Sequence, residues 1–144
     1  MTDKLTPLGL VSPNQSHIEL PLAQEGVQAG FPAPNGGYIE GDLDVNDFLI
    51  TSPSSTYIYQ VSGDSMCEAG IMHGDYVLVD SSRQARSGDI VVASVDNEFT
   101  IKKLVLGKRN KLVPCNCDYS EIEITENSRV VIIGPVISVI RKYH

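Results

Sequence analysis

The sequence predicts an all-β fold, a compact barrel-like or sandwich-like domain that follows an extended N-terminal arm. Short runs rich in β-branched and aromatic residues recur from Thr56 onward, and such residues favour strands. Before residue 55 the composition is different, because six of the eight prolines lie there. This change in composition predicts an N-terminal arm followed by a folded domain.

Length and composition are those of a folded protein. The chain has 144 residues, of which 42% are hydrophobic and 20% charged, so it can bury a core as one domain. Its formal net charge is −7. A protein that holds DNA by its overall charge presents a basic surface, so the acidic balance disfavours that class of function.

No part of the sequence predicts export or membrane insertion. The first residues lack the basic-then-apolar pattern of a signal peptide. The longest apolar stretch, residues 130–140, is too short for a bilayer and is interrupted by Gly134-Pro135. We therefore expect a soluble protein, with no membrane partner, that stays in the cytoplasm.

Residues 1–40 form the predicted arm and residues 41–144 the predicted domain. Proline removes a backbone donor, glycine is costly to order, and no regular period runs through residues 1–37. An extended or mobile arm is the expected result. The acidic stretch at 41–50 predicts one or two helical turns.

Six strands are predicted in the domain, separated by turn signals. They cover residues 57–61, 76–79, 90–95, 99–106, 130–133 and 136–141. Asp96-Asn97 stands between two of these runs and predicts a tight hairpin. Several short strands in succession are typical of a small barrel or sandwich.

Metal and cofactor sites are not indicated. The three histidines are scattered, and Cys115 and Cys117 are too close together for a zinc knuckle. With Cys67 the cysteines number three, and an odd number fits free thiols in a reducing compartment. Glycine loops that bind nucleotide phosphates are also absent from the sequence, so we predict no metal and no cofactor.

The turn that follows the first predicted strand of the domain contains Gly63-Asp64-Ser65. Gly63 permits a sharp turn, which we expect to expose the Ser65 hydroxyl. The same turn would leave successive backbone N–H groups available to stabilise an oxyanion. Most serines in such positions are only turn residues, so this signal by itself is weak.

Lys102 and Lys103 interrupt the apolar run of residues 98–106. Strand alternation puts Lys102 on one face with Thr100, and Lys103 on the other. At least one lysine is then partly desolvated, which favours a neutral amine that can take a proton from a serine hydroxyl. The alternative is an edge strand protected by two charges. Alternation does not choose between the two lysines.

Four motifs, taken in order, resemble the UmuD family of LexA-like self-cleaving serine proteases. They are SGDSM at 62–66, GDYVLVD at 74–80, GDIVVA at 88–93 and EFTIKKL at 98–104. The spacing of 37 residues from Ser65 to Lys102 fits the nucleophile and base of that family. The segment VQAGFPAP at 27–34 looks like the family's cleavage segment.

The resemblance implies a role for each matching residue. Ser65 is the implied nucleophile, Lys102 is the implied general base, and Ala29–Gly30 is the implied self-cleavage site. As oxyanion donors we add the backbone N–H groups of Asp64 and Ser65.

The chain departs from LexA repressors in one respect. Only 29 residues precede the implied cleavage bond, too few for a helix-turn-helix domain, so we expect no direct sequence-specific DNA binding. The UmuD branch implies a homodimer whose self-cleavage is promoted by a RecA–single-stranded DNA filament. Its product is implied to be the accessory subunit of a UmuC-type translesion DNA polymerase in the SOS response to DNA damage.

Three alternatives stay open. The first is a non-catalytic β-domain that binds a polymerase or a filament. The second is a LexA-like repressor relative that lacks its DNA-binding domain. The third is a signal peptidase, which shares the serine–lysine chemistry but is anchored in a membrane.

Overall fold

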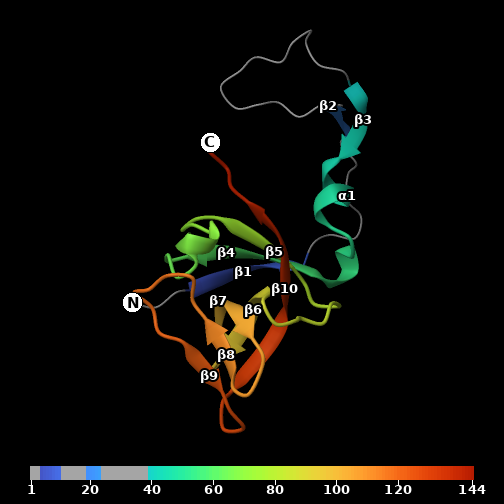
Figure 1. The fold of residues 1–144 in the computed structure, drawn as a ribbon. Helices are drawn as coiled ribbons and strands as arrows, with labels where there is room; N and C mark the ends of the chain where they lie inside the picture. Colours follow the sequence, from blue (N-terminus) through green and yellow to red (C-terminus); the bar gives the residue numbers. More distant parts are fainter. Residues whose placement is uncertain (1–3, 11–18, 24–38) are drawn as a thin grey trace. The chain divides into compact units, whose positions relative to one another are not determined.

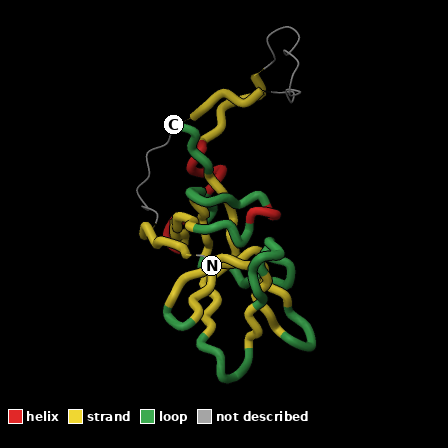
Figure 2. The backbone as a smooth tube through the Cα atoms, turned by 90° about the vertical axis from the view of Figure 1, so that its left-hand side faces the viewer, coloured by secondary structure: helices red, strands yellow, loops and turns green. Residues whose placement is uncertain are grey.

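The computed structural model describes residues 4–10, 19–23 and 39–144, and it confirms the all-β fold class. In the described part of the chain, helix consists of the short α1 (Val45–Leu49) and two 3-10 turns, Pro53–Ser55 and Cys67–Ala69, drawn in red in Figure 2. Within these described ranges, no helix is long and apolar enough to cross a membrane.

The chain divides into two compact units. One consists of Met1–Pro13 and Ser52–His144, and the other of Asn14–Thr51. The boundary expected from composition, between residues 40 and 41, stays a prediction.

The smaller unit contains a two-stranded antiparallel sheet and α1. The strands are β2 (Glu19–Ala23) and β3 (Ile39–Asp44). The helix begins where the Asp44 carboxylate accepts hydrogen bonds from the N–H groups of Asn46 (3.0 Å) and Asp47 (3.3 Å). It lies in the acidic stretch, as predicted.

The larger unit is one eight-stranded antiparallel sheet in the order β1-β4-β5-β10-β6-β7-β8-β9 (Figure 1). The strands are β1 (Lys4–Leu10), β4 (Thr56–Ser62), β5 (Tyr76–Asp80), β6 (Ile90–Val95), β7 (Glu98–Val105), β8 (Asn110–Val113), β9 (Ile122–Ile124) and β10 (Val130–Ile140). The sheet is not closed by hydrogen bonds, although β1 at one end also contacts β7. It is therefore an open, folded-over sheet rather than a closed barrel.

β10 joins the two halves of this sheet. Its first part pairs with β6 and its second part with β5, with register shifts at Ile132/Gly134 and Val136/Ser138. The sequence predicted two strands separated by Gly134-Pro135, whereas the structure has one strand that bends there. Glycine is required at 134 because a Cβ would lie 2.5 Å from the Asp80 carbonyl oxygen.

Five strands were not predicted, namely β2 and β3 of the smaller unit and three strands of the larger sheet. β8 and β9 have four and three residues, too few to show a clear period. β1 contains Pro7 and Gly9, which argue against a strand. It tolerates both because it is an edge strand and because the register shifts between Pro7 and Gly9, where Gly9 has φ 124°.

The hairpin predicted at Asp96-Asn97 is confirmed. It joins β6 to β7, and the two residues have φ 51° and 68°. Asparagine and aspartate tolerate this left-handed conformation better than other non-glycine residues, and the twist of the turn matches that of the strands.

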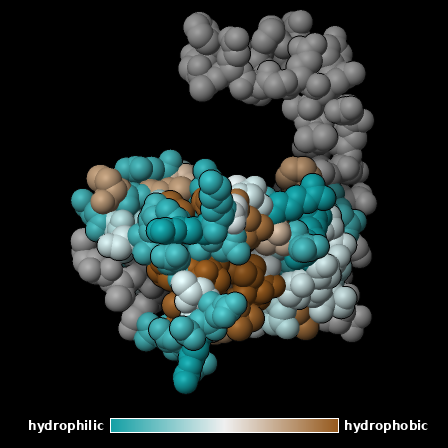
Figure 3. Space-filling model, turned by 60° about the horizontal axis from the view of Figure 1, so that its bottom comes forward, coloured by the Kyte–Doolittle hydropathy of each residue, from teal (hydrophilic) through white to brown (hydrophobic). Residues whose placement is uncertain are grey.

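Two apolar clusters lie on opposite faces of β6 and β7. The first is enclosed between the two halves of the sheet and contains Tyr59, Val61, Val92 and Ile101 among others. The second contains Val91, Ala93, Leu104 and Leu112. Apolar side chains also gather, in brown, on the face turned forward in Figure 3.

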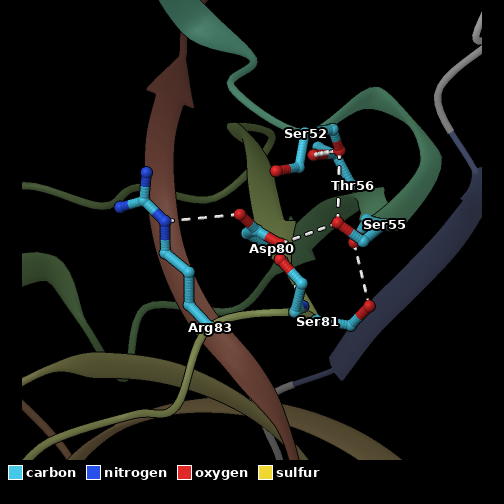
Figure 4. A network of polar contacts seen from close by, with 7 residues as sticks. Ser52, Ser55, Thr56, Asp80, Ser81 and Arg83 are labelled. Carbon is cyan, nitrogen blue, oxygen red and sulfur yellow. Dashed lines mark hydrogen bonds and ion pairs between the residues drawn. The ribbon is translucent and has the colours of Figure 1, made fainter.

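A polar network joins the start of β4 to the end of β5 (Figure 4). Asp80, 1% exposed, accepts hydrogen bonds from Ser55 Oγ (2.9 Å), Ser82 N–H (2.9 Å) and Ser82 Oγ (2.6 Å). Arg83 Nε lies 3.3 Å from its second oxygen. Burial opposes ionisation, but these hydrogen bonds and the guanidinium outweigh it, so the pKa of Asp80 lies below its usual value.

We predict that Asp80→Asn lowers the free energy of unfolding by about 1–3 kcal/mol at pH 7, because the donors of Ser55 and Ser82 lose an ionised, buried acceptor. A carboxyl with a depressed folded-state pKa stabilises the protein above its unfolded pKa, and this contribution is lost as the pH falls through the folded-state pKa. The difference between the two proteins in urea unfolding should therefore shrink below about pH 4. The exposed Glu126→Gln serves as the control. An equal loss from both variants would contradict the prediction.

Candidate active site

Ser65 lies in the turn that leaves β4. The strand ends at Ser62, and Gly63 adopts φ 100°, a conformation that glycine reaches without strain. Met66, the residue directly after Ser65, is 1% exposed and packs in the first apolar cluster. Ser65 is itself 1% exposed, so the expectation of an exposed hydroxyl is wrong. The buried Met66 thus directly follows a serine that is also buried.

Lys102 lies in the middle of β7, which forms a regular ladder with β6. Its side chain is 4% exposed, whereas Lys103 is exposed. Strand alternation left the choice between the two lysines open, and in the structure their burial distinguishes them. A charge-protected edge does not describe this strand, because β7 pairs with β6 on one side and β8 on the other.

The structure brings Ser65 and Lys102 together. Lys102 Nζ lies 3.1 Å from Ser65 Oγ, across 37 residues of sequence. Nζ also donates to Thr100 Oγ1 (2.8 Å) and to the Ile101 carbonyl oxygen (3.1 Å). Among the described residues, these three contacts give polar partners to the amine, which would be costly to bury without any.

The three partners suit a neutral amine as well as an ammonium. A neutral amine has two N–H groups and one lone pair. The Ile101 carbonyl can only accept a hydrogen bond, whereas a hydroxyl can either accept or donate. If a neutral amine directed its N–H groups at Ile101 and Thr100, its lone pair would face Ser65 Oγ, as a general base requires.

The loop before β9 supports the Ser65 turn from the other side. Asn116, 8% exposed, donates from Nδ2 to the Asp64 carbonyl oxygen (2.9 Å), which also accepts from Cys67 N–H (3.1 Å). Tyr119 donates from its hydroxyl to Asp64 Oδ1 (2.7 Å). The backbone carbonyl oxygen of Asp64 and its carboxylate oxygen Oδ1 are thus each held by a hydrogen bond from this loop.

These contacts fix the plane of the Asp64–Ser65 peptide. No cis peptide bond occurs in the described chain, so the Ser65 N–H points away from the carbonyl that Asn116 holds. The orientation of this N–H, one of the two predicted oxyanion donors, is therefore set by a residue 51 positions away. The oxyanion role of Asp64 and Ser65 stays a prediction.

An ion pair between Asp75 and Arg141 holds the loop that leads from the Ser65 turn into β5. Asp75, 1% exposed, forms two 2.7 Å contacts with Arg141 and accepts from Met72 N–H (2.8 Å). Hydrogen bonds from Arg141 lower the pKa of Asp75 and outweigh its burial. The Asp75 carbonyl in turn accepts from Val61 N–H (2.8 Å), so the ion pair steadies the end of β4.

The histidine and cysteines near the site have structural contacts. His73 Nδ1 accepts from Gly63 N–H (3.1 Å). The Cys115 carbonyl accepts from Glu68 N–H (2.9 Å), and Cys67 Sγ lies 3.5 Å from Asn116 Nδ2. Cys67, Cys115 and Cys117 are free. Within the described part of the chain, no three metal-ligating side chains converge.

A cleft of about 390 Å³ opens beside Lys102. It lies between the β6–β7 hairpin and the loop that carries Tyr119. The lining combines apolar side chains such as Phe99 and Ile122 with acidic ones such as Asp118.

Three supporting residues were not identified from the sequence. Thr100 had been placed on the same face as Lys102, and the spacing of two residues was the available signal for their contact. Asn116 and Tyr119 gave no signal, because their partner Asp64 lies more than 50 residues away. Ala29 and Gly30 lie outside the described residues.

Comparison with known proteins gives consistent matches. The family described as Peptidase S24-like matches residues 21–137. The protein ImpA of Escherichia coli is 39% identical over 122 residues, which are 85% of this chain and 83% of ImpA. The protein SamA of Salmonella typhimurium strain LT2 is 39% identical over 135 residues, 92% of this chain and 94% of SamA. LexA repressor 2 of Xanthomonas axonopodis pv. citri is 42% identical over 114 residues, 75% of this chain and 51% of the repressor.

We predict that an amine-directed acylating reagent modifies Lys103 of the folded protein much faster than Lys102, because only Lys103 is exposed. Peptide mass mapping after brief labelling measures the two rates. In denaturant, where both amines are accessible, the rates should become similar. Equal labelling in the folded protein would show that Lys102 is not enclosed as described.

Proposed function

Since the chain belongs to the Peptidase S24-like family, we propose that it is a serine–lysine protease that cleaves its own chain between Ala29 and Gly30. ImpA and SamA are UmuD-like proteins, so the resemblance to the UmuD family is confirmed. The observation that carries the proposal is the 3.1 Å contact between Lys102 Nζ and Ser65 Oγ in a buried site.

The first half of the reaction forms an ester. Neutral Lys102 takes the Ser65 hydroxyl proton as Oγ bonds to the Ala29 carbonyl carbon. The N–H groups of Asp64 and Ser65 stabilise the resulting oxyanion; one such donor is worth about 3–4 kcal/mol in other enzymes. When the Ala29–Gly30 C–N bond breaks, the Gly30 amine leaves with the proton from the Lys102 ammonium.

The second half returns the enzyme to its starting state. Lys102 takes a proton from water as the hydroxyl oxygen attacks the ester carbonyl. The bond to Ser65 Oγ then breaks, and the proton on Lys102 passes to that oxygen. Throughout both halves Ile101 and Thr100 hold the amine in position. The products are a new carboxylate on Ala29 and a free amine on Gly30.

The residues at the proposed cleavage bond suit a serine in a buried turn. Ala29 has a small side chain, and Gly30 has none, so the backbone can approach Ser65 closely. Because the substrate is part of the same chain, its effective concentration is high. We therefore include a conformational gate: access of the cleavage segment is the controlled step, and a partner shifts its population.

The proposed biological role follows the UmuD-like relatives. A homodimer of the chain would meet a RecA–single-stranded DNA filament in the cytoplasm, and this encounter would promote self-cleavage. Residues 1–40 would serve as the cleavable arm and 41–144 as the peptidase domain. The shortened product would act as the accessory subunit of a UmuC-type translesion polymerase. The net charge of −7 agrees with partner proteins, rather than the chain itself, holding the DNA.

We predict that Ser65→Ala and Lys102→Ala each reduce self-cleavage by about 10³-fold or more, since the nucleophile or its base is removed. Intact-mass analysis after incubation with a RecA–single-stranded DNA filament reports loss of residues 1–29 directly. Ser62→Ala and Lys103→Ala are matched controls on the same turn and strand, with exposed side chains. If Ser65→Ala lost its first 29 residues at the normal rate, the enzyme proposal would fail, and a non-catalytic binding module would remain.

We also predict that self-cleavage without any partner is faster at pH 10 than at pH 7. The base must be unprotonated to take the serine proton, and a higher pH increases the neutral fraction of an amine. The measurement is the first-order rate constant across this range, with folding checked at each pH. A flat profile would exclude Lys102 as the base.

A further inference from the structure

The strand β1 precedes the proposed cleavage bond, whereas its partner β4 follows it. β1 (Lys4–Leu10) forms an antiparallel ladder with β4, from Lys4 opposite Ser62 to Leu10 opposite Tyr57. A cut between residues 29 and 30 would therefore leave β1 on the sheet with no covalent link to it.

One side chain anchors β1 in the core. Leu5 is 6% exposed, stands opposite Val61 and packs in the first apolar cluster with Tyr59. The other large apolar residues of the strand, Leu8 and Leu10, are 52% and 49% exposed. Apart from the backbone ladder, attachment of β1 thus depends mainly on a single buried leucine.

Covalent attachment is what makes such a short contact persistent. A tethered strand is held at an effective concentration in the millimolar range, and a cut strand must bind at its actual concentration. β4 pairs with β5 along its other side, so departure of β1 leaves β4 as the edge of the sheet. Its outward backbone groups and the site of Leu5 are then uncovered.

We propose that cleavage turns the β4 edge into an exchangeable binding site for an extended segment of another chain, which adds as an antiparallel strand with an apolar side chain opposite Val61. The resident β1 defines the chemistry required of this segment: backbone pairing along Thr56–Ser62 and one apolar anchor. Strand addition of this kind obtains affinity from main-chain hydrogen bonds and specificity from side-chain pockets. The position of the cut rests on the proposed function.

The test separates the two proposals by using an added protease. The full chain carries Ser65→Ala and, between Ala29 and Gly30, the recognition sequence of a site-specific protease. A fluorescent peptide of residues 1–13 is the probe, and its anisotropy is measured with cut and uncut protein. We expect the cut protein to bind the probe and the uncut protein not to bind it, whether or not the natural chain cleaves itself.

Two altered probes test the anchor. A Leu5→Asp peptide should bind about tenfold more weakly or worse, because its buried apolar contact is lost. A Leu8→Asp peptide, changed at an exposed position of the same strand, should bind like the parent. Equal losses for both peptides, or equal binding to cut and uncut protein, would overturn the proposal. So would no binding to the cut protein, or its unfolding on cleavage as seen by circular dichroism.

Discussion

The enclosed contact between the Lys102 amine and the Ser65 hydroxyl is the constraint on which the surrounding structure depends. Lys102 is 4% exposed, and its amine is costly to bury unless it finds polar partners. Here the Ser65 and Thr100 hydroxyls and the Ile101 carbonyl supply those partners. Two of these three partners come from β7 itself, so the strand that carries the lysine also holds it, and Ser65 comes from the turn after β4.

Bringing the serine to the lysine requires support from several parts of the chain. Met66 is buried in the core, Asn116 holds the Asp64 carbonyl, and the Asp75–Arg141 pair steadies the adjoining loop. Each support contacts backbone or a neighbouring residue rather than the serine hydroxyl. A position fixed in this way gains precision from rigid elements, and small displacements are costly for catalysis.

Local patterns in the sequence predicted the strands β4 to β7 and β10, the Asp96-Asn97 hairpin and the meeting of Ser65 with Lys102, the last through resemblance rather than periodicity. What they did not predict depends on contacts distant in sequence. Burial of Ser65 follows from packing of Met66, and the roles of Asn116 and Tyr119 follow from a loop that returns to Asp64. Gly134-Pro135 predicted the end of one strand and the start of another, because glycine and proline are poor strand residues. In the structure β10 continues through them and only changes its pairing from β6 to β5.

The N-terminal segment has two competing properties in this arrangement. Its proline and glycine content favours an arm that can move, yet residues 4–10 add a strand to the sheet that carries the proposed catalytic residues. Pairing of β1 with β4 fixes one end of the arm, and the start of β4 at Thr56 fixes the other, so the chain between them is a closed loop. Fixing both ends of a loop restricts the positions that its central residues can reach. The entropic cost of closing the loop rises only slowly with its length. In the proposed function, control of the reaction falls on access of the cleavage segment to Ser65, and a partner would act by shifting the population that has access.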